Sequence, residues 1–542
     1  MATYPAYSGP RPQGDAPTSI WAPLRQRVFF AIWAAALASN IGTWMQNVGA
    51  AWLMTTLAPT PLKVALIQTA SSLPIFILAL PAGALADVVD RRRLLIFSQG
   101  WMLVAAGLLG GLTLAGITTP WALLVLSFAL GLGAALNAPA WQAIVPEVVS
   151  RADLTSAIAL NGINFNLARA VGPALGGLVV SSLGPGATFV LNAVSFLGVM
   201  VVLYGWKREH NPGVLPAERI WGAIRAGLRY VRHAPPLRAV LARTAAFVVG
   251  GSAMWAVLPL VAREELHMTA GGYGSLLAAF GTGAVAGGAM LPWLNRRMSR
   301  DMIVAISTLM FAGMTAALAL LRFMPAIYVM MAIGGAGWTT AMSVINVAAQ
   351  LSVPEWVQGR ALSCYQIILQ GGMALGAILW GVVAERWQVP ASLLAAACSM
   401  AIGMLTMWRY SLAQTDGLAL DLLPPMPAPE TSDRVENESG PVLVSTEYSI
   451  DPSRAGEFEQ AMVGLRTIRR RDGATFWGLF FDAREPEKYV EYFVVDSWIE
   501  HLRQHGRLTM ADKYIQDRVR AFQRDGKPPI IRHQIAAQSL RR

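Results

Sequence analysis

The chain has 542 residues, of which 54% are apolar and only 14% are charged. Soluble domains carry about 25% charged residues, so this composition, with a mean hydropathy of +0.45, excludes an ordinary soluble protein. The net charge of +11 does not indicate a nucleic acid partner, because +13 falls on the apolar residues 1–411 and only +3 on residues 441–542. Basic loops between membrane spans explain such an excess. We therefore expect a protein that lies in the lipid bilayer and binds no nucleic acid.

Residues 1–25 form a polar tail without the basic start and apolar run of a secretory signal. Twelve apolar segments follow, and most reach the roughly 20 residues that a membrane-spanning helix needs. They lie near residues 28–57, 64–86, 94–116, 120–145, 155–182, 186–206, 238–261, 271–293, 301–321, 325–350, 361–384 and 390–411. An even number of spans leaves both chain ends on one side of the membrane. Lys and Arg concentrate on that side, and only Lys63, Arg263, Arg322 and Arg386 fall in the opposite loops, so both termini are expected in the cytoplasm.

The longest connection between spans covers residues 207–237. Its apolar residues recur on one helix face and its arginines lie elsewhere, which predicts a short amphipathic helix at the membrane surface. This connection divides the spans into two six-helix bundles, residues 26–206 and 238–411. A Pro-rich linker over residues 412–440 then leads to a separate domain over residues 441–542.

A small, charged turn joins the second and third spans. Gly83 lets two helix backbones approach closely. Asp87 lies at the edge of the lipid core, where a carboxylate that faces a helix N-terminus or an arginine can act as a latch. Arg91 and Arg92 individually fit plain topological charge as well. The spacing of the four residues resembles the corresponding loop of the major facilitator superfamily. The resemblance implies an all-α membrane fold of twelve helices in two bundles, with this motif in gating.

The fifth span contains Arg169, Gly172, Pro173, Gly176 and Gly177. Pro173 removes a backbone donor and kinks the helix, and the glycines allow a neighbouring helix to pack closely. The pattern resembles the Gly-Pro-x-x-Gly-Gly motif of antiporter-type members of the superfamily, although small residues at this spacing also serve plain packing. An arginine inside a span is costly and usually faces a cavity or a partner. Arg169 therefore either contacts an anionic substrate, which we favour, or is a structural arginine bonded to carbonyls.

Residues 40–52, 161–177 and 359–372 are similar to the branch of the superfamily that contains enterobactin-type siderophore exporters, the transmembrane secretion effector type. The resemblance covers residues 25–411. It implies a secondary transporter in a bacterial cytoplasmic membrane that exports siderophore-like or drug-like amphiphiles by alternating access. Protons stay a candidate coupling ion, although Ser127 stands where many proton-driven drug exporters have an arginine. No nucleotide-binding P-loop occurs, which argues against ATP as the driver.

In this fold the first, fourth, seventh and tenth helices line a central cavity. Their polar and aromatic side chains are the candidate substrate contacts: Asn40, Gln46, Asn137, Gln142, Trp255 and Asn346. Amides in apolar helices serve equally well as links between helices. No Asp or Glu falls in the middle of a predicted span, which suits a neutral or anionic amphiphile better than a bulky organic cation.

The final domain alternates between strand and helix patterns. Strands are predicted near 442–450, 475–481, 489–495 and 530–536, and helices near 453–470, 497–504 and 510–524. The order βαββααβ resembles ferredoxin-like dimeric α/β barrels, which include antibiotic-biosynthesis monooxygenases, and implies pairing with a second copy of the chain.

Three histidines of this domain, His501, His505 and His533, raise the question of a haem or metal site. His501 and His505 share one helix face, but no third ligand is evident, so we expect solvated histidines, no metal and no cofactor. The main hypothesis is a transporter that is not an enzyme. The alternatives are a membrane-anchored α/β-barrel oxygenase and a membrane sensor that uses the transporter fold for binding.

Overall fold

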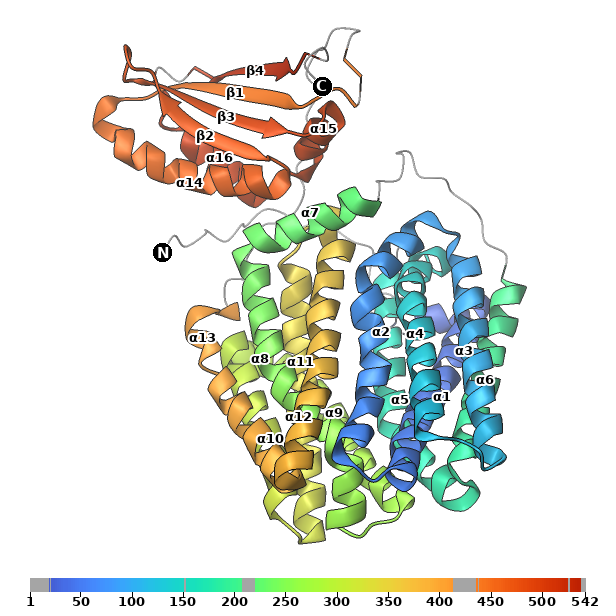
Figure 1. The fold of residues 1–542 in the computed structure, drawn as a ribbon. Coiled ribbons are helices and arrows are strands. Elements are labelled where there is room, and N and C mark those ends of the chain that lie inside the picture. Colours follow the sequence, from blue (N-terminus) through green and yellow to red (C-terminus); the bar gives the residue numbers. More distant parts are fainter. Residues whose placement is uncertain are drawn as a thin grey trace.

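The computed structural model describes residues 19, 21–150, 153–206, 220–412, 435–436, 438–524 and 527–537. Within these ranges it leaves out the side chains of residues 84, 86–88, 146, 220–226 and 355. A tall bundle of helices carries a small α/β domain at one end (Figure 1). We call this end of the bundle proximal and the opposite end distal.

The bundle consists of long apolar helices joined by short turns. The first half contains α1 (Arg27–Leu57), α2 (Pro61–Val88), α3 (Arg91–Leu114), α4 (Pro120–Val148), α5 (Leu154–Leu183) and α6 (Pro185–Gly205), after the short helix η1 (Ala22–Arg25). The second half contains α8 (Pro235–Leu260), η2 (Val261–Glu265), α9 (Ala270–Arg297), α10 (Arg300–Leu320), α11 (Met324–Leu351), η3 (Glu355–Val357), α12 (Gln358–Gly403) and α13 (Thr406–Arg409).

Eleven helices of the described chain are long and apolar enough to cross a membrane. The last of them, α12, has 46 residues and is interrupted at Trp387 and Gln388, whose backbone angles are not helical. The interruption falls between the two spans predicted at 361–384 and 390–411, so α12 comprises two helices. The fold of twelve helices in two bundles is thereby confirmed.

Local sequence explains where most helices begin. Proline occupies the first turn of α2, α4, α6, α8 and α11, where its missing N–H and its fixed φ cost nothing. Thr119, Thr269 and Ser299 cap α4, α9 and α10, because each side-chain oxygen accepts a hydrogen bond from a backbone N–H of the first turn. Hydropathy therefore sets the helix lengths, and prolines and caps set their starts.

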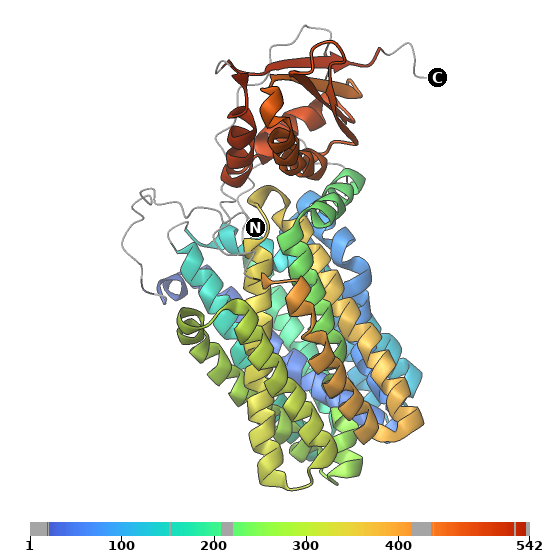
Figure 2. The ribbon, with the colours of Figure 1, turned by 90° about the vertical axis from the view of Figure 1, so that its left-hand side faces the viewer.

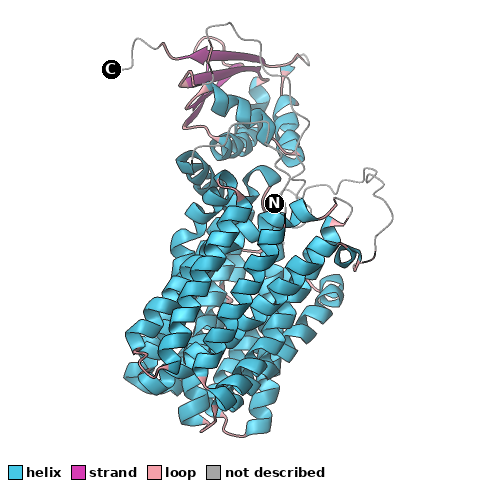
Figure 3. Ribbon diagram, turned by 90° about the vertical axis from the view of Figure 1, so that its right-hand side faces the viewer, coloured by secondary structure: helices cyan, strands magenta, loops and turns pink. Residues whose placement is uncertain are grey.

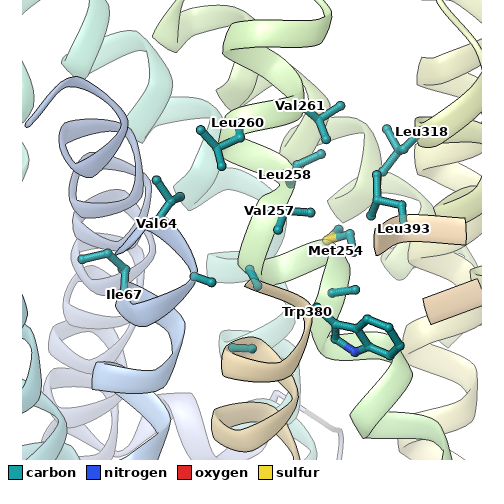
Figure 4. Close-up of a cluster of buried hydrophobic side chains, with 14 of the residues drawn as sticks. Val64, Ile67, Met254, Val257, Leu258, Leu260, Val261, Leu318, Trp380 and Leu393 are labelled. Atoms are coloured by element: carbon teal, nitrogen blue, oxygen red, sulfur yellow. The ribbon is translucent and has the colours of Figure 1, made fainter. Parts of the chain in front are cut away.

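The two halves meet along two helix pairs, α2 with α12 and α5 with α9. The side views show the long helices running from the proximal to the distal end of the bundle (Figures 2 and 3), and Figure 1 shows α7 lying across their proximal ends. Glycines permit the closest approach: a Cβ at Gly177 of α5 would lie 2.7 Å from the Cα of Gly274 of α9. The largest buried cluster spans both halves, with Val64 and Ile67 of α2 facing Met254 and Val257 of α8 (Figure 4).

Helix α7 (Ile220–His233) lies in the connection between the halves, where a short helix is predicted. It packs against α2, α8 and α12 of the bundle and against α14 of the α/β domain. Its predicted apolar stripe is described only in part: Leu228 is exposed, whereas Val231 packs in a cluster with Tyr230. Helix α7 is therefore buried on the face of Val231 and Tyr230 and exposed at Leu228.

The α/β domain has the predicted order βαββααβ. Its elements are β1 (Val442–Ser449), η5 (Pro452–Arg454), α14 (Ala455–Asp472), β2 (Phe476–Phe481), β3 (Lys488–Val495), α15 (Trp498–Arg507), α16 (Met510–Arg520) and β4 (Ile530–Ile535). The strands form an antiparallel sheet in the order β2-β3-β1-β4. The helices lie on one face of this sheet (Figure 1). On the other face Phe476, Phe480 and Ile530 are exposed.

Candidate functional site

The charged turn after α2 ties neighbouring helices of the first half together. Arg91 donates to the Glu147 carboxylate of α4 at 2.7 Å and to the carbonyl of Ala143 at 3.1 Å. Arg92 donates to the carbonyls of Leu203 and Tyr204 at 2.8 Å each. These carbonyls end α6, where a cation interacts favourably with the helix dipole.

The other two residues of this motif lie on α2. A Cβ at Gly83 would lie 3.3 Å from the Oγ of Ser363 on α12, so Gly83 faces the opposite half. The side chain of Asp87 lies outside the described residues. Glu147, the partner of Arg91, was not among the predicted site residues. Its signal in the sequence is the Val-Pro-Glu triplet, which occurs both at residues 145–147 and at residues 353–355.

The glycines of the fifth span let α5 pack closely against α1 and against α9. A Cβ at Gly172 would lie 2.5 Å from the Cβ of Trp44, and one at Gly176 would lie 2.8 Å from the Cα of Met45. Gly177 meets α9 of the other half, as described above. Pro173, between these glycines, is also buried. Residues larger than glycine would push these helices apart.

Arg169 reaches from α5 to the opposite half of the bundle. Its Nη2 donates to Thr339 Oγ1 on α11 and to Asn166 Oδ1, each at 2.8 Å. Its carbon Cζ lies 5.9 Å from the ring centre of Phe165. The Nε–H is buried and has no hydrogen-bond partner. Within the described residues the guanidinium therefore donates to side-chain oxygens and not to backbone carbonyls, and its Nε–H is left to bind a further group.

Three of the predicted cavity amides form hydrogen bonds between helices of the first half. Asn40 donates to Asn164 at 2.9 Å, and Gln46 accepts from Asn192 at 2.7 Å. Asn137 accepts hydrogen bonds from Ser98 at 3.2 Å and from Gln99 at 3.1 Å, both on α3. These contacts are those of amides that link helices.

The remaining candidates lie in different surroundings. Asn346 accepts a hydrogen bond from Gln350, one turn further along α11, and Gln142 is exposed. Trp255 belongs to a group of tilted and edge-on rings that we call the central aromatic cluster. Its members are Trp44, Phe247, Trp255, Phe280, Phe311 and Trp338.

The central aromatic cluster joins the halves, because Trp44 of α1 lies 6.1 Å from Trp255 of α8, centre to centre. Trp255 in turn lies 5.8 Å from Trp338 of α11. The indole N–H of Trp255 is buried and has no hydrogen-bond partner, although a buried indole normally finds one. Trp338 directly precedes Thr339, the partner of Arg169. The centre of the bundle therefore contains aromatic surface and two unused donors.

The distal ends of the halves are also in contact. Arg263 of η2 donates to Thr55 Oγ1 of α1 at 3.1 Å and lies 5.9 Å from the ring centre of Trp52. Trp52 stacks on Tyr273 of α9 at 6.1 Å with an interplanar angle of 21°. A hydrogen bond, a cation–π contact and a ring stack thus connect the two halves at this end.

The histidines of the α/β domain correct the expectation that they are solvated. His501 is only 2% exposed, and its ring centre lies 4.8 Å from that of His505 and 4.7 Å from that of His533. Burial lowers the pKa of His501 to about 3 and also lowers the pKa of the other two. The error arose because His533 comes from β4, about thirty residues away, and only the sheet brings it to α15. Within the described residues, no group of three His, Cys, Asp or Glu is arranged to hold a metal ion.

Known proteins resemble this chain over the helical bundle, and a family model matches nearly all of it. The family model described as transmembrane secretion effector matches residues 18–540. The multidrug efflux pump Tap of Mycolicibacterium fortuitum is 27% identical over 398 residues, which cover 70% of this chain and 95% of that protein. The enterobactin exporter EntS of Salmonella typhimurium is 26% identical over 358 residues, which cover 65% of this chain and 84% of that protein.

A solved structure supports the fold independently of sequence. A mutant of the nucleoside transporter NupG superposes with a TM-score of 0.60 at 11% identity and covers 71% of this chain and 100% of that chain. These relatives are transporters and not enzymes, which removes the support for the oxygenase alternative. With a family match that runs through both halves and the α/β domain, the chain belongs to the transmembrane secretion effector family of major facilitator transporters.

Proposed function

We propose that the protein is a secondary exporter of siderophore-like or drug-like amphiphiles, which it moves by alternating access across a bacterial cytoplasmic membrane. The single observation that carries this proposal is the centre of the bundle, where Arg169 and Trp255 each keep a buried donor without a partner. Two halves that meet through helix pairs and side-chain contacts can rock about such a midplane site. The named functions of Tap and EntS agree with export.

The chemistry at this centre favours a neutral or anionic substrate with aromatic or other apolar surface. A guanidinium with a free Nε–H is suited to a carboxylate or phenolate oxygen. The aromatic rings around Trp255 offer apolar contact area at low entropic cost. The amides Asn40, Gln46, Asn137, Gln142 and Asn346 stay candidates for substrate contact when the halves move, since hydrogen bonds between amides can exchange partners.

The remaining motifs fit roles in the movement. We assign Gly83, Asp87, Arg91 and Arg92 to gating at the proximal end, because Gly83 faces α12 and Arg91 and Arg92 brace α4 and α6. The close contact of Gly177 with Gly274 makes the antiporter-like motif a seam along which α5 and α9 separate. The distal contacts around Arg263 fit a conformation closed toward the outside, with both termini in the cytoplasm.

Transport assays in proteoliposomes test the proposal. Purified protein is reconstituted with an imposed pH gradient, and accumulation of enterobactin, a carboxylate siderophore and tetracycline is measured. We expect at least one compound to accumulate with the gradient and to be released by a protonophore, which would make protons the coupling ion. The matched control is Arg169→Met at equal abundance, which should transport poorly. Binding of a compound without accumulation would instead favour the sensor alternative.

A second proposal concerns the assembly. The exposed sheet face with Phe476, Phe480 and Ile530 suits pairing with the same face of a second copy, since monomeric soluble domains rarely leave large apolar patches uncovered. Residues 441–542 would then form a domain of their own after the linker over 412–440.

A further inference from the structure

The α/β domain is docked on the bundle through charged and aromatic side chains. Arg229 of α7 lies 3.3 Å from the Glu500 carboxylate of α15. The guanidinium carbon of Arg507 lies 4.6 Å from the ring centre of Trp356 in η3. That of Arg471 lies 5.9 Å from the ring centre of Tyr230 in α7. Three arginines from three helices therefore join the domain to α7 and to the connection between α11 and α12.

The charges at this contact are buried and satisfied within the domain. Arg507 is 4% exposed and donates to Glu500 at 2.6 Å and to the carbonyl of Asp472 at 2.7 Å. Arg471 pairs with Asp472 and with Asp512 at 2.7 Å and 2.8 Å. Burying a charge is costly unless it is paired. The pairs within the domain therefore allow Arg471 and Arg507 to stay charged where they contact Tyr230 and Trp356 of the bundle.

The backbone at the contact is shaped for it as well. Gly473 ends α14 with φ of 135°, a conformation that favours glycine. A Cβ at this position would lie 3.5 Å from Nη2 of Arg229 and 3.2 Å from the Glu500 carboxylate. Gly473 therefore lies directly beside the pair of Arg229 and Glu500, and its positive φ is the feature that requires glycine there.

Helix α7, on which the domain rests, lies at the proximal seam between the two halves. Tyr230 is 2% exposed and donates to the carbonyl of Ser352 at 2.9 Å, and a Cβ at Gly227 would lie 3.0 Å from the Cβ of Arg360 on α12. On its other side α7 packs against α2. These are the helices whose proximal ends approach each other at Gly83 and Ser363. Anything that holds α7 in place therefore holds this seam.

We propose that the docked α/β domain is a brake on the exchange between conformations. Alternating access requires α2 and α12 to change their relation at the proximal end, and α7 must follow because it contacts both. The domain fixes α7 through Arg229 and η3 through Trp356, so its contacts must loosen before the distal ends can part. This inference rests on the proposed transport function and adds a means of regulating it.

The distal ends provide a reporter that requires no substrate. Ala270 of α9 is 5% exposed, and its carbonyl oxygen would lie 2.9 Å from a Cβ at Gly177 of α5, so Ala270→Cys places a buried thiol where the halves meet at the distal end. Opening of this end exposes the thiol to a membrane-impermeant maleimide. The rate of modification under reducing conditions, in a background with Cys364→Ala and Cys398→Ala, measures how often the end opens.

Two changes on the bundle side weaken the docking without touching the folded core of the domain. Arg229→Glu places a carboxylate opposite Glu500, and Trp356→Ala removes the ring beneath Arg507. The matched control is Arg532→Glu. It places a carboxylate opposite Glu447 on the sheet of the domain, where Arg532 of β4 and Glu447 of β1 lie 2.7 Å apart. Arg229→Lys keeps the positive charge, so the domain should stay docked in this variant. Amide hydrogen exchange of α7 and α15 reports whether docking is lost.

We expect the double change Arg229→Glu with Trp356→Ala to speed exchange in α7 and α15 and to raise the rate of thiol modification at least fivefold, while Arg532→Glu and Arg229→Lys leave both unchanged. Faster hydrogen exchange in α7 together with an unchanged or slower rate of thiol modification would overturn the brake. Unchanged exchange in the double variant would overturn it too, since these contacts would not hold the domain. Neither readout depends on a transported compound, so failure of the transport proposal would be seen separately, in the proteoliposome assay.

Discussion

Arg169 on α5 and Thr339 on α11 are joined by a hydrogen bond of 2.8 Å that connects the two halves of the bundle. The two residues are 170 positions apart in the chain. Another of the five guanidinium donors, the buried Nε–H, has no hydrogen-bond partner among the described residues, so the contact with Thr339 leaves Arg169 with an unused donor. A group that is oriented in this way is suited to receive an anionic oxygen.

The first prediction follows from that orientation. Arg169→Lys should retain part of substrate binding and Arg169→Met should lose most of it, because lysine keeps the charge and not the planar fork. Dissociation constants from scintillation proximity or fluorescence titration measure the effect. Thr339→Val serves as the control, since it removes the contact between halves and leaves the guanidinium. Normal binding by both arginine variants would refute a role for Arg169 in recognition.

The second prediction concerns Asp87, the acidic residue of the turn after α2. Asp87→Asn should leave the protein folded and inserted and should slow transport, since a carboxylate near a helix end contributes about 0.3–2 kcal/mol. Asp90→Ala is the comparison: Asp90 caps α3 by accepting from the Arg93 N–H at 2.9 Å, so loss of the cap should lower stability by about 1 kcal/mol. Equal transport rates in Asp87→Asn and the parent protein would remove the latch.

The third prediction is a reversible lock at the distal end. With thiols at positions 181 and 271, whose Cβ atoms would lie 3.8 Å apart, oxidation should form a disulfide, because this separation suits its geometry. Transport should then stop and return after reduction. The single variants Ser181→Cys and Gly271→Cys, treated in the same way, should stay active. Full transport by a cross-linked protein would contradict alternating access through this end.

The fourth prediction is that the α/β domain is dispensable for basic transport. Removal of residues 424–542 should leave an active carrier, since the domain has hydrophobic clusters of its own, such as the one around Phe458 and Met462. Loss of transport at normal abundance would show that the domain is part of the machinery.

The same prediction extends to the isolated domain. Residues 441–542 expressed alone should be soluble, should be dimeric by light scattering through the face with Phe476 and Phe480, and should contain no haem or metal. Phe480→Lys should make it monomeric. A monomeric product with a bound cofactor would revive the oxygenase hypothesis.

The fifth prediction is a pH dependence of domain stability. The pKa of His501 falls from 6.5 to about 3 in the folded domain because burial disfavours the imidazolium. Below pH 6.5 the unfolded chain therefore binds a proton that the folded domain excludes, and stability falls by up to about 1.4 kcal/mol per pH unit between pH 6.5 and 3. Above pH 6.5 this term is constant.

Urea unfolding of residues 441–542 at pH 7.5, 5.5 and 4.5 measures the effect. His501→Leu, which cannot bind the proton, should show a shallower decline over the same range, so the difference between the two proteins isolates the histidine. Parallel curves for both proteins would mean that the folded domain accommodates the charge.

Much of the fold was predictable from the sequence because its signals are local. Long apolar runs predicted the spans, including the two that meet at Trp387 and Gln388 within α12. Alternation and helical periodicity predicted the order βαββααβ. Both signals come from residues that are neighbours in the chain, and burial in lipid or against a sheet acts on each segment separately.

The sequence alone determined that this protein spans a membrane as two bundles and carries an appended α/β domain, and it identified Arg169 and Trp255 as residues to consider. Only the tertiary structure decided what these residues contact: Thr339 for Arg169, a central aromatic cluster for Trp255, and His533 for His501. Such pairings depend on the rotation of each helix about its axis and on packing between segments far apart in the chain. Neither quantity is encoded in local periodicity, which fixes which face is apolar and leaves open which partner that face will meet.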